Sequence, residues 1–147
     1  MNIISRSQAK LLSEFARTKR LIAVVVKGQR DFFLNLEDLA EQRPQDVGLF
    51  AFAPKESKFN ETVQRFDAVI GYDVKETVGK KFRTFEEIEI PELDPFMEEL
   101  TRIVPKEKIC MIHCEENSIA AVCRTRKRFG LGGRSFYWVG ALKMSVT

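Results

Sequence analysis

Residues 108–133, KICMIHCEENSIAAVCRTRKRFGLGG, decide the fold that the sequence predicts. The segment opens with the apolar run Ile109 to His113, which has the length of a buried strand, and passes through a polar turn at Cys114 to Asn117. Apolar residues at helical spacing then continue to Phe129, and Gly130 ends the helix. Open α/β sheets bind ligands beyond the carboxyl ends of their strands. We therefore expect any ligand site to lie at the turn between this strand and this helix.

The residues before this segment alternate between buried strands and amphipathic helices. Strands are predicted at 21–26, 47–52, 66–72 and 108–113, with a further one at 135–139, and helices at 5–20, 35–42, 58–65, 94–104 and 117–129. Residues 73–93 alternate apolar and charged side chains, which suits an edge strand or an ordered excursion. The alternation predicts a Rossmann-like three-layer α/β sandwich with a mainly parallel sheet of four to six strands. A single domain is expected over 1–147, with an amino-terminal helix within 1–20 and a tail at 134–147.

The composition describes an ordinary globular domain. The chain has 147 residues, of which 44% are hydrophobic and 31% are charged, and its net charge of +3 does not by itself imply nucleic acid. The amino terminus lacks the apolar region of a secretory signal, and no apolar run is long enough to span a bilayer. Three cysteines, an odd number, indicate reduced thiols. These features predict a cytoplasmic protein without a membrane partner.

The helix after Cys114 carries a recognisable order of residues. An acidic residue and Asn117 stand at its start, two alanines lie inside it, Arg124 follows, and RFGL at 128–131 leads to a closing glycine. This order resembles the end of the pre-ATP-grasp domain, the amino-terminal domain of ATP-grasp carboxylate–amine ligases and carboxylases. The strand ending FDAVI at 66–70 fits the same domain, so the resemblance covers most of the chain. It implies a substrate-side or assembly domain of an ATP-dependent ligase.

The sequence departs from the family pattern after the glycine exit. In the family, this exit leads into two ATP-grasp subdomains, which hold the ATP phosphates and the magnesium ions. Here only residues 134–147 follow. The resemblance therefore implies a domain that is not catalytic alone, with no cofactor of its own; ATP and magnesium enter only with an ATP-grasp core. The expected partner is such a core or a second copy of the chain.

Two groups of residues are candidates for binding. The resemblance assigns substrate or partner contact to Glu115, Asn117, Arg124 and Gly130; the acidic residues also fit a helix N-cap and first turn. After the first predicted strand, Lys27, Gly28 and Arg30 suit an anion-binding turn. A plain tight turn is the alternative there, because one glycine stands where the dinucleotide fingerprint has three.

The cysteines and the only histidine invite two further hypotheses, a metal site and a Cys–His nucleophile. Cys110, Cys114 and Cys123 include no CxxC pair, and His113 has no second histidine to join it. Adjacent residues on a strand point to opposite faces, which places His113 and Cys114 poorly for pairing. We therefore expect the three cysteines to be buried thiols. Neither a metal site nor a catalytic residue is predicted.

A dense basic run lies at the end of the last helix. It comprises Arg124, Arg126, Lys127, Arg128 and Arg134. A solvated face that complements the negative end of the helix is favoured over nucleic acid, because the aromatic residues interleaved in single-strand binders are missing. Two alternatives to the ligase domain stay open: a stand-alone interaction or dimerisation module, and a small nucleotide- or nucleic-acid-binding protein that uses 124–134.

Overall fold

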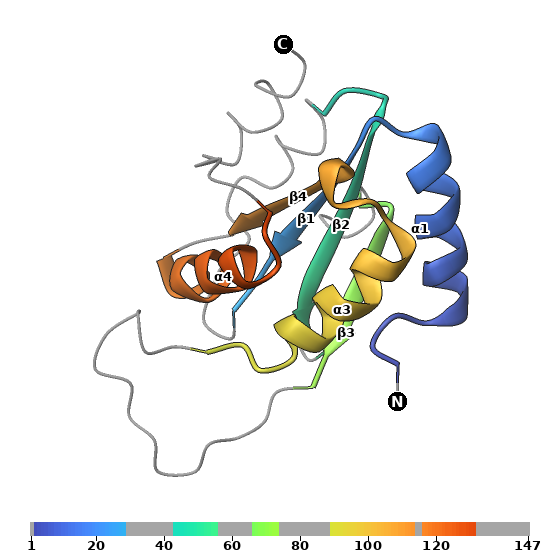
Figure 1. The fold of residues 1–147 in the computed structure, drawn as a ribbon. Coiled ribbons are helices and arrows are strands. Elements are labelled where there is room, and N and C mark those ends of the chain that lie inside the picture. The colour runs from blue at the N-terminus through green and yellow to red at the C-terminus, as the bar shows by residue number, and fades with distance from the viewer. Residues whose placement is uncertain (1, 29–42, 56–65, 74–88, 114–115, 132–147) are drawn as a thin grey trace.

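The computed structural model describes residues 2–28, 43–55, 66–73, 89–113 and 116–131 (Figure 1). In chain order the elements are α1 (Arg6–Thr18), β1 (Leu21–Val26), β2 (Val47–Pro54), β3 (Ala68–Tyr72), α3 (Leu93–Ile103), the short 3-10 helix η3 (Lys106–Lys108), β4 (Ile109–His113) and α4 (Glu116–Arg128). Each predicted strand and helix within these ranges is present, with ends shifted by two residues or fewer. The helices predicted at 35–42 and 58–65 and the strand predicted at 135–139 lie outside the described residues, as do 74–88 of the excursion.

The four strands form one parallel sheet in the order β3-β2-β1-β4. In its register, Leu21 of β1 lies opposite Val47 of β2, and Val26 lies opposite both Phe52 and His113. The protein is thus an α/β fold with a parallel sheet flanked by helices, as the sequence predicts for a Rossmann-like sandwich.

The strand order reverses once. From β1 the chain steps to β2 and then to β3 in one direction; after β3 it returns through α3 to the opposite side of β1, where β4 pairs. The reversal point therefore lies between the carboxyl ends of β1 and β4. In open α/β sheets, this is the position at which ligands bind.

Both faces of the sheet are buried. Ile22, Val24 and Val26 belong to a core cluster that includes residues of α1, α3 and α4, the helices that pack on one side of the sheet (Figure 1). Ala23 and Val25 belong to a second cluster, whose described members are strand residues and Phe66. Full burial of each valine or isoleucine stabilises the fold by roughly 1.5–3 kcal/mol. Burial on two sides explains why β1 reads as a continuous apolar run.

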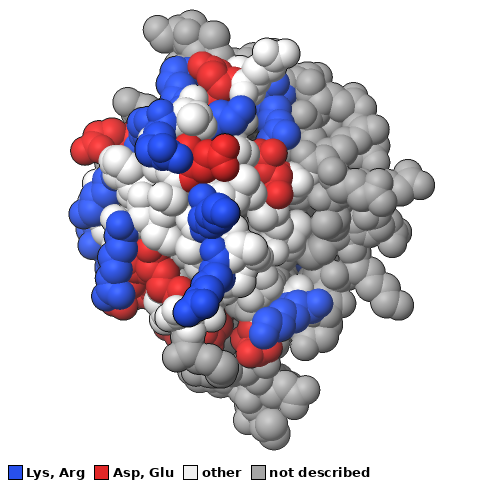
Figure 2. All heavy atoms as spheres, turned by 90° about the vertical axis from the view of Figure 1, so that its right-hand side faces the viewer, with Lys and Arg blue, Asp and Glu red and all other residues white. Residues whose placement is uncertain are grey.

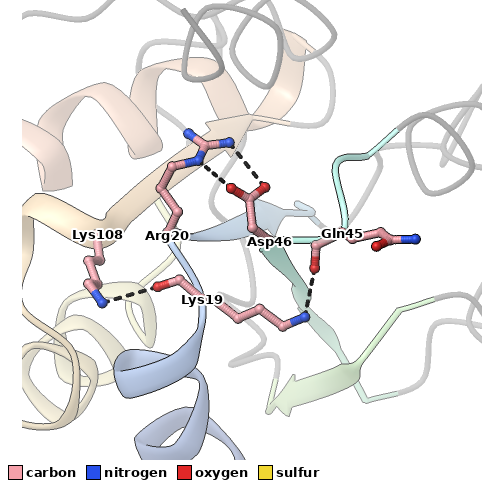
Figure 3. Close-up of polar contacts among 5 residues, drawn as sticks. All are labelled: Lys19, Arg20, Gln45, Asp46 and Lys108. Carbon is pink, nitrogen blue, oxygen red and sulfur yellow. Dashed lines mark hydrogen bonds and ion pairs between the residues drawn. The ribbon is translucent and has the colours of Figure 1, made fainter.

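Helix α1 is fixed at both ends. At its start, the Ser5 hydroxyl accepts a hydrogen bond from the Gln8 amide and the Gln8 side chain accepts one from the Ser5 amide, which is a capping box. At its end, the Lys108 ammonium donates to the carbonyl oxygen of Ala16 at 2.6 Å. It also donates to the carbonyl oxygen of Lys19 at 3.1 Å (Figure 3). A cation at this end complements the helix dipole. The cap joins α1 to the start of β4.

The helix also packs closely on the sheet. A Cβ at Gly48 would lie 2.7 Å from Cδ2 of Phe15, so the glycine in β2 makes room for this ring. The Phe15 ring meets Phe50 edge to face at 5.7 Å between centroids.

Charged contacts join the amino ends of neighbouring strands. Before β1 and β2, the Arg20 guanidinium makes a fork with the Asp46 carboxylate, at 2.7 and 3.3 Å (Figure 3). Before β3, Asp67 accepts from Arg43 at 2.6 Å and from the Leu49 amide at 2.8 Å. These contacts hold the strands in register, so the amino edge of the sheet has a structural role.

Candidate functional site

The candidate site lies at the opposite edge of the sheet, where β1 and β4 end side by side. Val26, the last residue of β1, pairs with His113, the last residue of β4. Lys27 and Gly28 follow β1 and are buried. Helix α4 begins at Glu116, three positions after His113, so the helix starts close to the same edge of the sheet. The amino-terminal end of a helix carries a partial positive charge.

The backbone of Lys27 is held on both sides. Its amide donates to the carbonyl oxygen of Phe52 at 2.8 Å, which extends the ladder between β1 and β2 by one residue. Its carbonyl oxygen accepts a 2.7 Å hydrogen bond from the hydroxyl of Tyr72, the last residue of β3. Hydrogen bonds to β2 and to β3 thus fix the backbone directly after β1.

An aromatic stack supports the tyrosine. The Tyr72 ring stacks on Phe52 with centroids 4.6 Å apart, and Phe52 stacks on Phe96 of α3 at 4.4 Å. All three rings are buried. Contacts between stacked aromatic rings are favourable beyond their buried area. The stack sets the position of the Tyr72 hydroxyl and, through it, the carbonyl of Lys27.

The side chain of Lys27 is also buried, since only 8% of the residue is exposed. Strand alternation places it on the face of Ala23 and Val25. Its ammonium lies 3.4 Å from the Gly28 carbonyl oxygen, a long hydrogen bond. Lysine is seldom buried, because removing an ammonium from water is costly unless it is paired.

The structure separates the residues that the family resemblance assigns to binding. Asn117 is the second residue of α4, Arg124 lies two turns further on, and Gly130 follows the far end of the helix. At 1.5 Å per residue, Asn117 and Gly130 are about 20 Å apart along the helix axis. Glu115 and Arg30 lie outside the described residues. Of the candidates that the structure describes, Lys27 and Gly28, together with Asn117 in the first turn of α4, lie at the strand ends.

Gly130 has a clear structural role. Its φ of 66° is left-handed, the Leu131 amide donates to the Arg126 carbonyl at 2.9 Å, and the Gly130 amide donates to the Lys127 carbonyl at 3.3 Å. These two bonds make a Schellman motif. Leu131 packs against the first core cluster, which fixes the direction in which the chain leaves α4.

The expectation of buried thiols is correct for Cys110 and wrong for Cys123. Cys110 lies in β4 and is buried, whereas Cys123 is exposed. On α4, Ala121, Val122 and Thr125 are buried, and Cys123 falls on the outer side of the helix. Cys114 lies outside the described residues. Within the described ranges, no group of three or more His, Cys, Asp or Glu side chains is placed to hold a metal ion.

The basic run is partly engaged in contacts between helices. Arg128 pairs with Asp94 of α3 at 3.1 Å, and the Thr125 hydroxyl donates to the same carboxylate at 2.8 Å. The face of the molecule that carries α1 is a different one, and there Lys and Arg side chains are interspersed with Asp and Glu (Figure 2). Lys127 and Arg128 are exposed, in keeping with a solvated face for that part of the run. Arg134 lies outside the described residues.

Sequence reasoning missed Tyr72, which it treated only as the end of a strand. The available signal was weak: one of the two tyrosines in the chain ends a predicted strand at the edge where ligands are expected. Its contact with Lys27 depends on the strand order.

Comparisons with protein-family models, with curated proteins and with solved structures found no match to the chain. In the part of the chain that the structure describes, no helix is both long enough and apolar enough to cross a membrane.

Proposed function

We propose that the chain is a pre-ATP-grasp-like domain, which serves an ATP-dependent ligase as its substrate-side or assembly module. The observation that carries the proposal is the path of the chain from β4 into α4. This path starts at the reversal point of the sheet and ends at a left-handed Gly130. Residues 115–133, which resemble the family, cover most of the same path.

The two ends of α4 have different roles in this proposal. The amino-terminal end lies next to the strand ends and faces the ligand. The carboxyl-terminal end, closed by the Schellman motif, directs the chain or a partner contact toward the ATP-grasp core. In such a ligase the core holds ATP and magnesium, and this domain contributes ligand contacts and positioning.

A reconstitution experiment tests the proposal. The ATP-grasp core encoded in the same protein or beside its gene is produced with and without this chain, and ATP-dependent product formation is measured. We expect the complete pair to be active and each part alone to be inactive. An Arg124→Ala variant should lower the activity, whereas Arg17→Ala, a matched change at an exposed arginine of α1, should not. A core that is fully active without this chain would refute the proposal.

A second candidate function is a stand-alone interaction or dimerisation module. Ile119 is 37% exposed on α4, and the exposed Cys123 lies one turn further along the same helix. Together they give α4 a small outward apolar patch. Light scattering tests this candidate: a dimer that an Ile119→Lys substitution dissociates would support it, and a strict monomer over the accessible concentration range would count against it.

A further inference from the structure

Strand β4 ends the described sheet, but it is buried like an interior strand. It follows β1 in the strand order, and no described strand lies on its other side. Its first four residues, Ile109 to Ile112, are nevertheless all buried, with 8% exposure or less. An edge strand normally presents one row of backbone groups to the surroundings. The burial of β4 therefore indicates cover along its outer edge as well as on its two faces.

The opposite edge of the sheet provides the comparison. In β3, three of the five residues, Ala68, Val69 and Gly71, are only partly buried. Natural proteins protect exposed edge strands with charges, prolines or bulges. The sequence of β4, ICMIH, contains no proline, lysine or acidic residue. Continuous apolar sequence of this kind is typical of a parallel strand inside a sheet.

The hand of the crossovers indicates which edge the chain reaches after α4. The connection from β3 to β4 passes through α3, on the face of the sheet that also carries α4 (Figure 1). Connections between parallel strands of one sheet are right-handed in about 98% of cases. Because α4 packs on the same face as α3, a right-handed connection through α4 continues in the same direction across the sheet. A parallel strand that follows α4 would therefore pair with the outer edge of β4.

The end of α4 brings the chain back to the start of this edge. The 13 residues of α4 extend about 20 Å, and the 5 residues of β4 extend about 17 Å. The helix thus returns to the level at which β4 begins. Leu131, which follows the left-handed Gly130, packs against the first core cluster and keeps the chain close to the sheet.

We propose that the outer edge of β4 is a pairing site for a further parallel strand, and that residues 135–139 of this chain supply it. These residues, SFYWV, lie outside the described part of the chain. Aromatic and β-branched residues favour strands, and the run equals β4 in length. It follows Leu131 after three residues, within the roughly 2–6 that commonly join a helix to a strand. Such a strand closes this edge against pairing with a second copy. The inference does not depend on the proposed function.

Isotope-filtered NMR of the full chain tests the proposal. A mixture of labelled and unlabelled chains separates nuclear Overhauser contacts within one molecule from contacts between molecules. We expect contacts within one molecule between the backbone protons of 109–113 and 135–139, in the pattern of parallel strands. Contacts between molecules would assign the edge to a second copy. That result, an antiparallel pattern, or no contact between the two segments would overturn the inference.

Two neighbouring proline substitutions give an independent test. In an edge strand, proline is tolerated where the backbone amide faces away from the neighbouring strand and is disruptive where the amide pairs. Of Phe136→Pro and Tyr137→Pro, one should therefore speed hydrogen exchange of β4 amides by about fivefold or more, as expected for lost hydrogen bonds. The other should leave exchange within about twofold of the wild type. Equal effects of the two folded variants would overturn the inference. If either variant does not fold, the contacts in the wild-type chain decide alone.

Discussion

The hydroxyl of Tyr72 donates a 2.7 Å hydrogen bond to the backbone carbonyl oxygen of Lys27, across the strand that separates them. This bond joins the ends of β3 and β1 at the edge of the sheet where ligands are expected. The amino edge is joined instead by charged pairs such as Arg20 with Asp46. At the carboxyl edge, buried contacts fix the turn after β1, and an exposed ion pair between Lys55 and Asp73 joins the ends of β2 and β3.

The first prediction concerns this bond. Tyr72→Phe keeps the ring that stacks on Phe52 and removes only the hydroxyl. The variant should lose about 1–3 kcal/mol of unfolding free energy, because the buried Lys27 carbonyl oxygen loses a donor. Urea denaturation measures the loss. Thr101→Val is the control, since its hydroxyl bonds to the Met97 carbonyl inside its own helix and should matter little. Equal stability of Tyr72→Phe and the wild type would show that the bond does not form in solution.

The second prediction concerns the cap of α1. Lys108→Met removes the ammonium that donates to the Ala16 and Lys19 carbonyls and keeps most of the side-chain stem. We expect a loss of about 1 kcal/mol in thermal or urea unfolding, since a charge-assisted bond and a favourable helix-dipole contact are both removed. Lys106→Met changes a neighbouring exposed lysine and should have almost no effect. Similar losses in both variants would argue against a specific cap.

The third prediction concerns the end of α4. Gly130 has a φ of 66°, and a Cβ there would meet no atom within 4 Å, so a side chain costs only backbone strain. Gly130→Ala should therefore destabilise the fold by about 1–2 kcal/mol. Gly130→Asn should cost less, because asparagine tolerates the left-handed region. The order of the two variants in chemical denaturation is the test; an alanine variant as stable as the wild type would contradict the Schellman geometry.

The fourth prediction concerns pH. The hydrogen bond from Arg20 holds the pKa of Asp46 below its ordinary value of 3.8, so the folded state favours the ionised carboxylate. Its contribution to stability is present above pH 3.8, the ordinary value, and is lost as the pH falls through the lower value in the folded protein. An NMR titration of the Asp46 carboxyl carbon should show this low pKa. In Arg20→Met it should rise toward 3.8; no change would place Arg20 away from Asp46 in solution.

Much of the fold was predictable because strands buried on both faces leave little ambiguity. LIAVVV at 21–26 and ICMIH at 109–113 are too short for core helices and rich in apolar residues, and both are strands. The order of the sheet was not encoded in these runs. The strand order determines which strand ends lie side by side. The sequence therefore predicted a site after β4 but did not predict that β1 pairs with β4.

The side-chain contacts were less predictable, for a physical reason. Lys108 and the Ala16 carbonyl that it caps are 92 positions apart, and Tyr72 and Lys27 are 45 apart, so only tertiary packing brings them together. Cys123 is exposed because of how α4 is rotated about its own axis relative to the sheet. The spacing of apolar residues defines this rotation only coarsely. Lys27 was singled out as an anion-binding candidate by its place after a strand, but its burial could not be read from the sequence.

Hydrogen exchange tests the central claim, the proposed assembly with an ATP-grasp core, most directly. Exchange of backbone amides is compared between the isolated chain and the chain mixed with the proposed core, ATP and substrate. We predict added protection at residues 26–28 and 128–131, with exchange in α1, residues 6–18, unchanged. Protection confined to α1, or no change at residues 26–28 in an active complex, would contradict the assignment of the carboxyl edge of β1 and β4 as the ligand-facing edge.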